Sequence, residues 1–378
     1  MARTRHPVVL IHGVFGYGRS RPFWNRWQPY WPERELQAMH ARCLVVDVGA
    51  LSSDHDRACE AFFQLFGGRV DYGDDHAARH GHARFGETFD TALHPQWSAE
   101  NPVHLVGHSV GATTAIELYQ LICTDAFGVG SDHRWVRSIV SIAGPLSGTT
   151  LTHFFGLHEA TMVPWTLGHA IGASLSLWLR LQRLCPWLKG VYDFRMPQWE
   201  PLTSFRDILM PTTSRVLMSP DLAVYDILPA RRQARNKQLV DMEKLFLVSV
   251  VTASSATTPV IELALVTAIV GVLVSALLLW SVLDRRDLAS SAAALSFVLW
   301  LRLRKRIFLP IMQWRMRRCV RGMHKPYAGF ERSEWEANDG AVNLCSMAGT
   351  GGSAREKAVG GCRCLQHDDD SDSEDTGK

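Results

Sequence analysis

The sequence predicts an α/β fold with a mostly parallel sheet flanked by helices. Three apolar runs rich in β-branched residues, at 6–11, 103–106 and 136–143, are typical of strands buried on both faces. The second run leads into a glycine-containing turn, and residues 112–121 after that turn favour a helix. A strand, a short turn and a helix in this order are the unit from which such sheets are built.

The turn after the second run has the sequence Gly107-His108-Ser109-Val110-Gly111. A Gly-x-Ser-x-Gly turn between a strand and a helix is typical of the nucleophile elbow of α/β-hydrolases. The glycines are expected where the serine backbone is strained and neighbouring elements pass too close for side chains. The helix N-terminus after Ser109 would offer N–H groups to a developing oxyanion. The alternative is an ordinary strand-to-helix turn that carries a surface serine.

The first apolar run leads into the loop His12-Gly13-Val14-Phe15-Gly16. In α/β-hydrolases a His-Gly loop after an early strand carries one N–H of the oxyanion hole, which here would belong to Val14. The second N–H would come from Val110, directly after the nucleophile. A glycine-rich turn without a catalytic task is the alternative. Four aromatic residues between 24 and 31 predict core or pocket wall.

Composition sets limits on the class of protein. The chain has 378 residues, 47% of them hydrophobic, which suffices for one large core or two modest ones. A net charge of +3 is too small to predict a nucleic-acid partner. The eight cysteines are irregularly spaced and do not form a disulfide framework. Because the first residues lead straight into a strand, we expect no secretory signal.

Residues 51–86 contain the most informative motifs in the chain. These are Leu-Ser-Ser-x-x-Asp-Arg-Ala-Cys-Glu-Ala, Gly-Gly-x-Val-Asp-Tyr-Gly and His-Ala-Ala-x-His-Gly-His-Ala-Arg-Phe-Gly. Three histidines within seven residues have the composition of a metal site, although a polar surface is the commoner reason for such a cluster. The motifs closely resemble the zinc-containing thermoalkalophilic bacterial lipases and their plant relatives. The likeness covers most of residues 6–255 and returns near 327–347.

The resemblance implies an α/β-hydrolase that cleaves triacylglycerols and other carboxylic esters and holds a structural Zn²⁺. The zinc ligands would be Asp56, His76, His82 and Asp221, whereas His80 matches no ligand of the family. Two carboxylates and two imidazoles form a closed, neutral, tetrahedral set, which suits a structural rather than a catalytic ion.

The resemblance also assigns the catalytic acid to Asp339, in an Asn-Asp-Gly sequence that is a strong turn signal in its own right. α/β-Hydrolases order their triad Ser, Asp, His, and His367 is the one histidine after Asp339. It begins an acidic tail that cannot hold an imidazole accurately beside Ser109. His12 and His108 flank the elbow and the oxyanion loop rather than face the acid. We therefore expect the chain as written to lack a well-placed catalytic histidine, through a truncated or mispredicted C-terminus or as a true pseudoenzyme.

Several apolar segments predict contact with lipid. Residues 153–189 are expected to be helical and amphipathic, either a lid that turns its apolar face to a lipid surface or a plain core helix. A late strand is expected at 244–251. Residues 263–283 form an uncharged apolar run of bilayer-spanning length, and a shorter run at 288–301 is followed by many arginines. We expect residues 263–301 to contact membrane as a hairpin or an interfacial pair; a misjoined gene insert is the alternative.

The sequence thus predicts a hydrolase core at 1–255 with a lid-like region at 151–190, an apolar insertion at 256–310, the rest of the core at 311–348, and a disordered acidic tail at 349–378. The predicted function is a lipase or carboxylesterase that hydrolyses triacylglycerol or related lipid esters through Ser109. The alternative is a catalytically inactive, lipase-like, membrane-associated protein. The expected partners are a lipid ester and a membrane or lipid surface, and the location is membrane-associated.

Overall fold

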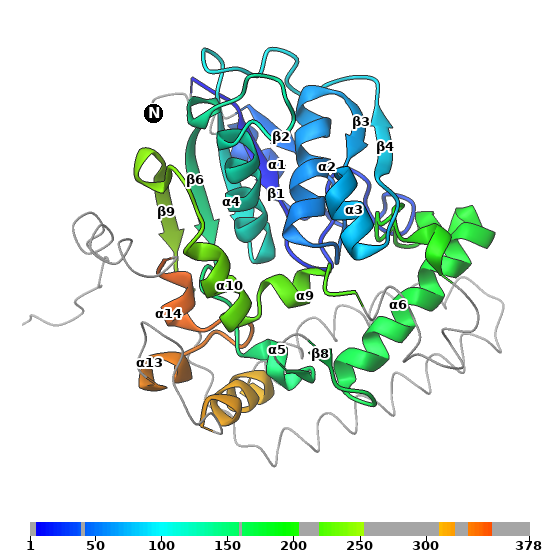
Figure 1. Ribbon diagram of the computed structural model, residues 1–378, viewed down its shortest axis with the longest axis vertical. Helices are drawn as coiled ribbons and strands as arrows, with labels where there is room; N and C mark the ends of the chain where they lie inside the picture. The colour runs from blue at the N-terminus through cyan, green and yellow to red at the C-terminus, as the bar shows by residue number, and fades with distance from the viewer. Residues whose placement is uncertain are drawn as a thin grey trace, which may run out of the picture.

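The computed structural model describes residues 5–38, 42–158, 161–203, 219–252, 310–321 and 332–349 (Figure 1). A parallel sheet of five strands lies at its centre, in the order β2–β1–β5–β6–β9. The strands of this sheet are β1 (Val8–Ile11), β2 (Cys43–Val45), β5 (Val103–His108), β6 (Val136–Ile142) and β9 (Phe246–Val250). Two small antiparallel pairs accompany it, β3 (Gly68–Asp71) with β4 (Phe85–Phe89), and β7 (Leu157–His158) with β8 (Thr161–Met162).

The longer helices are α2 (Asp54–Phe66), α4 (Val110–Cys123) and α6 (Leu167–Leu184). The shorter ones are α1 (Glu33–Ala38), α3 (Asp74–His80), α5 (Leu151–Phe154), α9 (Ala223–Asp226), α10 (Pro229–Asn236), α13 (Arg332–Glu336) and α14 (Leu344–Met347). Residues 310–321 form a further helix, unlabelled in Figure 1. The predicted α/β fold with a mostly parallel sheet is confirmed, and so are the strands predicted at the elbow and on either side of it.

The direction in which successive strands are added to the sheet reverses at β1. From this strand the chain proceeds outward to β2 on one side, and later returns to add β5, β6 and β9 on the other side. The loops that leave β1 and β5 therefore diverge at the carboxyl edge of the sheet, which is where open α/β sheets form their binding crevice. These two loops are the predicted oxyanion loop and the predicted elbow.

α2 and α4 lie side by side over one face of the sheet (Figure 1). Nearly all of α4 is buried, because it packs against β5 and β6 on one side and against α2 on the other. Leu105, Ile116, Phe62 and Ile139 belong to this shared core. Burying one such side chain stabilises the fold by about 1.5–3 kcal/mol. The core thus fixes the strand before Ser109 and the helix after it as one rigid unit.

The prediction that residues 153–189 are helical throughout is wrong. α5 ends at Phe154, the β7–β8 hairpin follows, and α6 begins only at Leu167. The backbone of Gly156 has a φ of +92°, and a Cβ there would lie 2.4 Å from the side chain of Thr166. That threonine begins α6, because its hydroxyl accepts the N–H of His169. The high apolar content of this segment favoured a continuous helix over the turn at Gly156 and the helix cap at Thr166.

The two glycines of the elbow have no room for a side chain. A Cβ on Gly111 would lie 2.1 Å from the carbonyl oxygen of Ile11, and one on Gly107 would lie 2.2 Å from that of Gly111. We expect Gly111→Ala to lower the melting temperature strongly or to prevent folding, because the nearest atoms are backbone atoms of Ile11 and His12, at the end of β1 and in the loop after it. Gly128→Ala is the control: its φ of +65° is also strained, but nothing lies within 4 Å. Equal losses in the two variants, measured by thermal unfolding, would contradict this reading.

Candidate active site and metal centre

Ser109 occupies the turn between β5 and α4. Its backbone has φ 54° and ψ −127°, a strained conformation for a residue with a side chain. Among the described residues, backbone bonds hold it there: its N–H donates to the carbonyl of Ile142 at 2.9 Å, and its own carbonyl accepts from the N–H of Ala112 at 3.0 Å. The side chain is half-buried and takes no part in fixing the turn. The geometry is that of a serine presented for reaction.

The predicted oxyanion loop lies against this serine. A Cβ on Gly13 would lie 2.9 Å from the Cβ of Ser109, so the two loops are in direct contact. Val14, which follows Gly13, packs against Val110 and Ile227. Two N–H groups proposed for the oxyanion, on Val14 and Val110, therefore come from neighbouring segments at the same edge of the sheet.

Tyr30 and Arg57 support these loops, and sequence reasoning missed both roles. The Tyr30 hydroxyl accepts the N–H of Gly13 at 3.1 Å and lies 2.5 Å from Nδ1 of His108. Arg57 is completely buried, and its guanidinium donates to the carbonyl of His12 and, at 2.9 Å, to the hydroxyl of Thr114 on α4. It also donates to the Gly49 carbonyl at 2.5 Å. Arg57 thereby joins the oxyanion loop to the helix of the elbow.

Asp339 lies beside the end of β9. One carboxylate oxygen accepts the hydroxyl of Thr252 at 2.7 Å, two residues after the strand, and the other accepts the N–H groups of Ala341 and Val342 at 2.8 Å. The Asn-Asp-Gly turn therefore fixes the Asp339 carboxylate at the carboxyl edge of the sheet. A position after a late strand is where an α/β-hydrolase can use an acid.

In the part of the chain that the structure describes, no histidine is hydrogen-bonded to Asp339 or to the Ser109 hydroxyl. His12 is engaged through both ring nitrogens, and burial together with the charge of Arg57 lowers its pKa to about 4. Burial likewise lowers the pKa of His108, an effect that the Asp339 carboxylate partly opposes. His367 lies outside the described residues.

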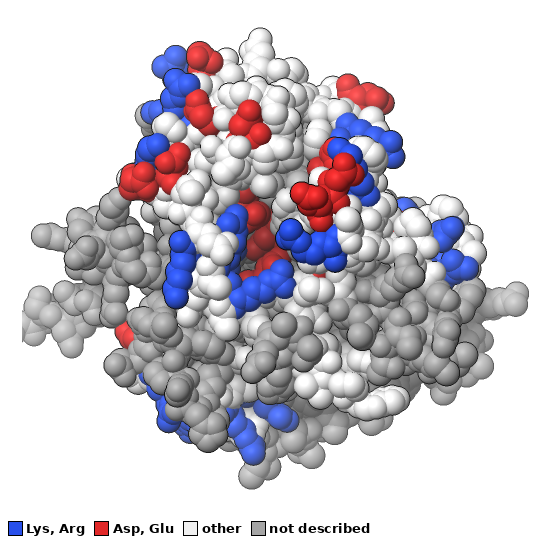
Figure 2. All heavy atoms as spheres, viewed as in Figure 1, with Lys and Arg blue, Asp and Glu red and all other residues white. Residues whose placement is uncertain are grey.

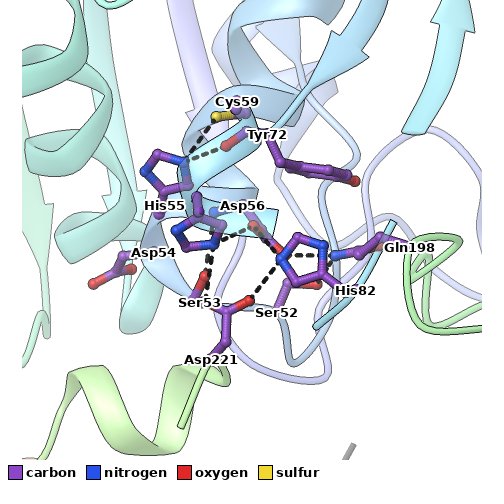
Figure 3. Close-up of polar contacts among 12 residues, drawn as sticks. Ser52, Ser53, Asp54, His55, Asp56, Cys59, Tyr72, His82, Gln198 and Asp221 are labelled. Atoms are coloured by element: carbon purple, nitrogen blue, oxygen red, sulfur yellow. Dashed lines mark hydrogen bonds and ion pairs between the residues drawn. The ribbon is translucent and has the colours of Figure 1, made fainter. Parts of the chain in front are cut away.

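The four residues implied as metal ligands converge on one point (Figure 3). One ligand atom from each of Asp56, His76, His82 and Asp221 lies within 4.8 Å of the others. Nε2 of His76 is 3.1 Å from the Asp56 carboxylate and 3.2 Å from that of Asp221, and Nε2 of His82 is 3.2 Å from Asp221. Three of them come from α2 and the α3 region, and the fourth, Asp221, comes from the segment before α9, far from the others in the sequence.

The cluster fits a metal ion by its chemistry as well as by its position. In each of the four residues a buried ligand atom has no hydrogen-bond partner, a costly arrangement unless a cation binds there. The neighbouring atoms are oriented for this role: Nδ1 of His82 bonds the carbonyl of Ala83 at 2.9 Å, and the Gln198 amide donates to the second oxygen of Asp56 at 2.7 Å. These residues could therefore hold a metal.

Other acidic and basic residues nearby do not join the cluster. Asp54 points away from it in Figure 3 and accepts the hydroxyls of Thr113 and Thr114 on α4, each at 2.9 Å. Asp226 accepts the N–H of Asp54 at 2.7 Å, and burial next to that carboxylate raises its pKa to about 8. The His80 ring lies 4.6 Å from the His76 ring, tilted by 48°, and contributes no ligand atom. This arrangement agrees with the resemblance, which leaves His80 out of the metal ligands.

An apolar cavity of about 150 Å³ lies next to the oxyanion loop. Val14 and Ile227, which pack beside Val110, form part of its wall, so the cavity lies close to Ser109, the residue before Val110. α5, β8 and α6 form another part of the wall through Leu151, Thr152, Met162, Gly168, Ile171, Gly172 and Leu175, and α9 with the segment before it contributes Leu222, Val224 and Tyr225. α6 therefore lines an apolar cavity, an arrangement that both a lid and a core helix can have. Trp165, just before α6, is 86% exposed.

The predicted membrane segment at 263–301 lies outside the described residues. Within the described ranges, no helix has the length and apolar character needed to cross a bilayer.

A family model described as "Lipase-like, C-terminal domain" matches residues 4–127. Lipase 2 of Staphylococcus aureus strain MRSA252 is 30% identical over 251 residues, which are 59% of this chain and 34% of that protein. Lipase 1 of the same strain is 34% identical over 255 residues, 60% of this chain and 35% of that protein. The chain thus matches about a third of the length of these curated relatives.

Solved structures show the same fold. EstA from Clostridium botulinum aligns with a TM-score of 0.59 at 24% identity, over 92% of this chain and 75% of EstA. Lipase 1 from Pelosinus fermentans aligns with a TM-score of 0.57 at 24% identity, over 91% of this chain and 84% of that chain. The Staphylococcus hyicus lipase aligns with a TM-score of 0.57 at 19% identity, over 93% of this chain and 82% of that chain. In sequence this chain is similar to bacterial lipases over about 60% of its length, and it shares the α/β fold of the three solved structures.

Proposed function

We propose that this protein hydrolyses carboxylic esters of lipids, triacylglycerol or related esters, with Ser109 as the nucleophile. The observation that carries the proposal is a strained serine that touches a second backbone loop and lies close to an apolar cavity. Such a cavity fits an acyl chain, since it is apolar and shares Val14 and Ile227 with the surroundings of the serine.

In the proposed reaction, Oγ of Ser109 attacks the ester carbonyl carbon while an imidazole takes its proton. The N–H groups of Val14 and Val110 stabilise the negative oxygen of the tetrahedral intermediate. Collapse of this intermediate expels the alcohol, which takes the proton from the imidazolium, and leaves an acyl-serine. Water then attacks the acyl-serine with the same base, releases the fatty acid and restores Ser109. Asp339 would orient the imidazole. His367 is the one histidine that follows Asp339 in the sequence and is therefore a weak candidate for this role, because the acidic tail that it begins is expected to place it poorly.

We also propose that the metal is Zn²⁺, bound by Asp56, His76, His82 and Asp221. Two imidazoles and two carboxylates suit zinc and leave no open position for substrate. Bound there, the ion would neutralise the buried carboxylates and join α2, α3 and the segment before α9. The chemistry at Ser109 does not involve it.

A fluorophosphonate probe tests the proposed nucleophile. The phosphorus is attacked by an activated serine and loses fluoride, so we expect one covalent label, which peptide mass spectrometry should place on Ser109. Asp339→Asn is the matched variant, because it keeps the size of the side chain but no longer orients the imidazole as an anion. We expect it to slow labelling by about 10⁴-fold, the effect of the equivalent change in a well-studied triad. Absence of labelling in the parent protein would overturn the proposal and favour the inactive, lipase-like, membrane-associated alternative.

A further inference from the structure

The helix at 310–321 has two chemically different faces. Its buried face consists of Met312, Gln313, Met316 and Val320. Its exposed face consists of Trp314, Arg315, Arg317, Arg318 and Arg321. The Gln313 side chain anchors the buried face, since it donates to the carbonyl of Asn338 at 3.1 Å. The helix is therefore held against the Asn-Asp-Gly turn with its arginines directed outward.

Most of this positive charge is not compensated within the described part of the chain. Arg321 forms an ion pair with Glu336 at 3.1 Å. Arg315, Arg317 and Arg318 form no ion pair with a carboxylate of the described residues. Two of them lie over the Trp314 ring instead, at 5.4 Å from its centroid. An aromatic ring attracts a cation without neutralising it, so three guanidinium charges remain available to an anionic partner.

The basic face continues into an exposed apolar strip. Arg315 also lies 5.5 Å from the Phe154 ring on α5, and α5 packs against the β7–β8 hairpin. After this hairpin come Val163, Trp165 and Leu167, which are 39%, 86% and 49% exposed. Figure 2 shows basic atoms gathered along the lower edge of the molecule, where Figure 1 places helix 310–321. Arginines and exposed tryptophans thus occupy connected parts of one edge.

We propose that helix 310–321 is a docking surface for anionic phospholipid headgroups, with Arg315, Arg317 and Arg318 as its contacts. Guanidinium groups bind phosphate and carboxylate oxygens in pairs, and tryptophan favours the headgroup region of a bilayer. The exposed apolar strip favours a lipid surface over a nucleic acid, which offers no apolar layer to Trp165 or Leu167. If the proposed ester hydrolysis also holds, docking would bring α5 and β8, which line the apolar cavity, close to the lipid.

The test uses the purified full chain with vesicles of phosphatidylcholine alone or mixed with phosphatidylserine, separated by flotation. We expect the parent protein to bind the mixed vesicles more tightly and to lose the difference at high salt. The triple variant Arg315→Gln, Arg317→Gln, Arg318→Gln should weaken binding to mixed vesicles on the order of a hundredfold, since each arginine near an anionic surface contributes roughly fivefold. Its melting temperature should stay unchanged, because all three side chains are exposed.

A second triple variant controls for net charge. Arg34→Gln, Arg69→Gln and Arg137→Gln remove three exposed arginines from α1, β3 and β6 and should leave binding unchanged. An equal loss in both triple variants would overturn the proposal, because any positive charge would then suffice. Equal binding to neutral and anionic vesicles that resists high salt and carbonate would also overturn it, since the apolar run at 263–301 would then be responsible. Binding to a DNA duplex but not to the vesicles would assign the face to nucleic acid instead.

Discussion

Replacing Ser109 by alanine is expected to abolish ester hydrolysis while leaving the fold intact. The side chain makes no contact that fixes the turn: the bonds to Ile142 and Ala112 use backbone atoms, and alanine keeps the Cβ that faces Gly13. The cavity and both proposed oxyanion N–H groups remain. A serine hydrolase without its nucleophile retains only about 10³- to 10⁴-fold catalysis over water. The rate should therefore fall by several orders of magnitude, measured with short-chain esters against a parent of equal melting temperature.

Ser20→Ala is the matched control, because Ser20 is an exposed serine far along the oxyanion loop from the elbow. It should hydrolyse the same esters at the parental rate. Parental activity in the Ser109→Ala protein would show that the elbow is a structural turn and that another residue carries out the reaction.

Loss of the metal is expected to lower the melting temperature by about 5 °C. A ligand that binds only the folded state at a thousand times its Kd stabilises by about 4 kcal/mol. At about 2.1 cal/mol/K per residue, a chain of 378 residues has an unfolding entropy of about 0.8 kcal/mol/K, so each kcal/mol shifts the melting temperature by roughly 1.3 °C. Without the ion, the carboxylates of Asp56 and Asp221 remain buried, and they are opposed only by His76 and His82. Elemental analysis should find about one zinc per chain, released as pH falls, because protons compete for the two imidazoles.

His82→Ala should lose both the zinc and the added stability. His80→Ala is the matched control, since its ring lies 4.6 Å from that of His76 but offers no ligand atom to the cluster. A metal-free preparation with the parental melting temperature would refute the structural role. Equal metal loss in the two variants would refute the ligand set.

The elbow was predictable from sequence because its signals are local. A strand, two glycines around a serine and a helix occupy consecutive residues, and each requirement is visible in the side chains themselves. The distant metal ligand Asp221 was not predictable in this way. Its pairing with Asp56 on α2 spans more than a third of the chain, and it came from the resemblance to a family rather than from spacing.

Tyr30 and Arg57 show where sequence reasoning fails. Tyr30 bonds to His108 across 78 residues and Arg57 bonds to His12 across 45, and no periodicity marks such pairs. A tyrosine in an aromatic-rich loop and an arginine within a helix have ordinary local explanations. The glycine turn at Gly156 had a visible signal, but the surrounding apolar residues favoured a continuous helix over 153–189.

Three neighbouring residues at the start of α2 have different roles. Asp54 holds two threonines of α4, Asp56 belongs to the metal cluster, and Arg57 holds the carbonyl of His12. A change that moved Asp56 by shifting α2 would also move Arg57, and with it the carbonyl of His12 in the oxyanion loop. If the cluster binds a metal as proposed, a centre with no part in the chemistry would thus restrict how the loop that serves the chemistry can change.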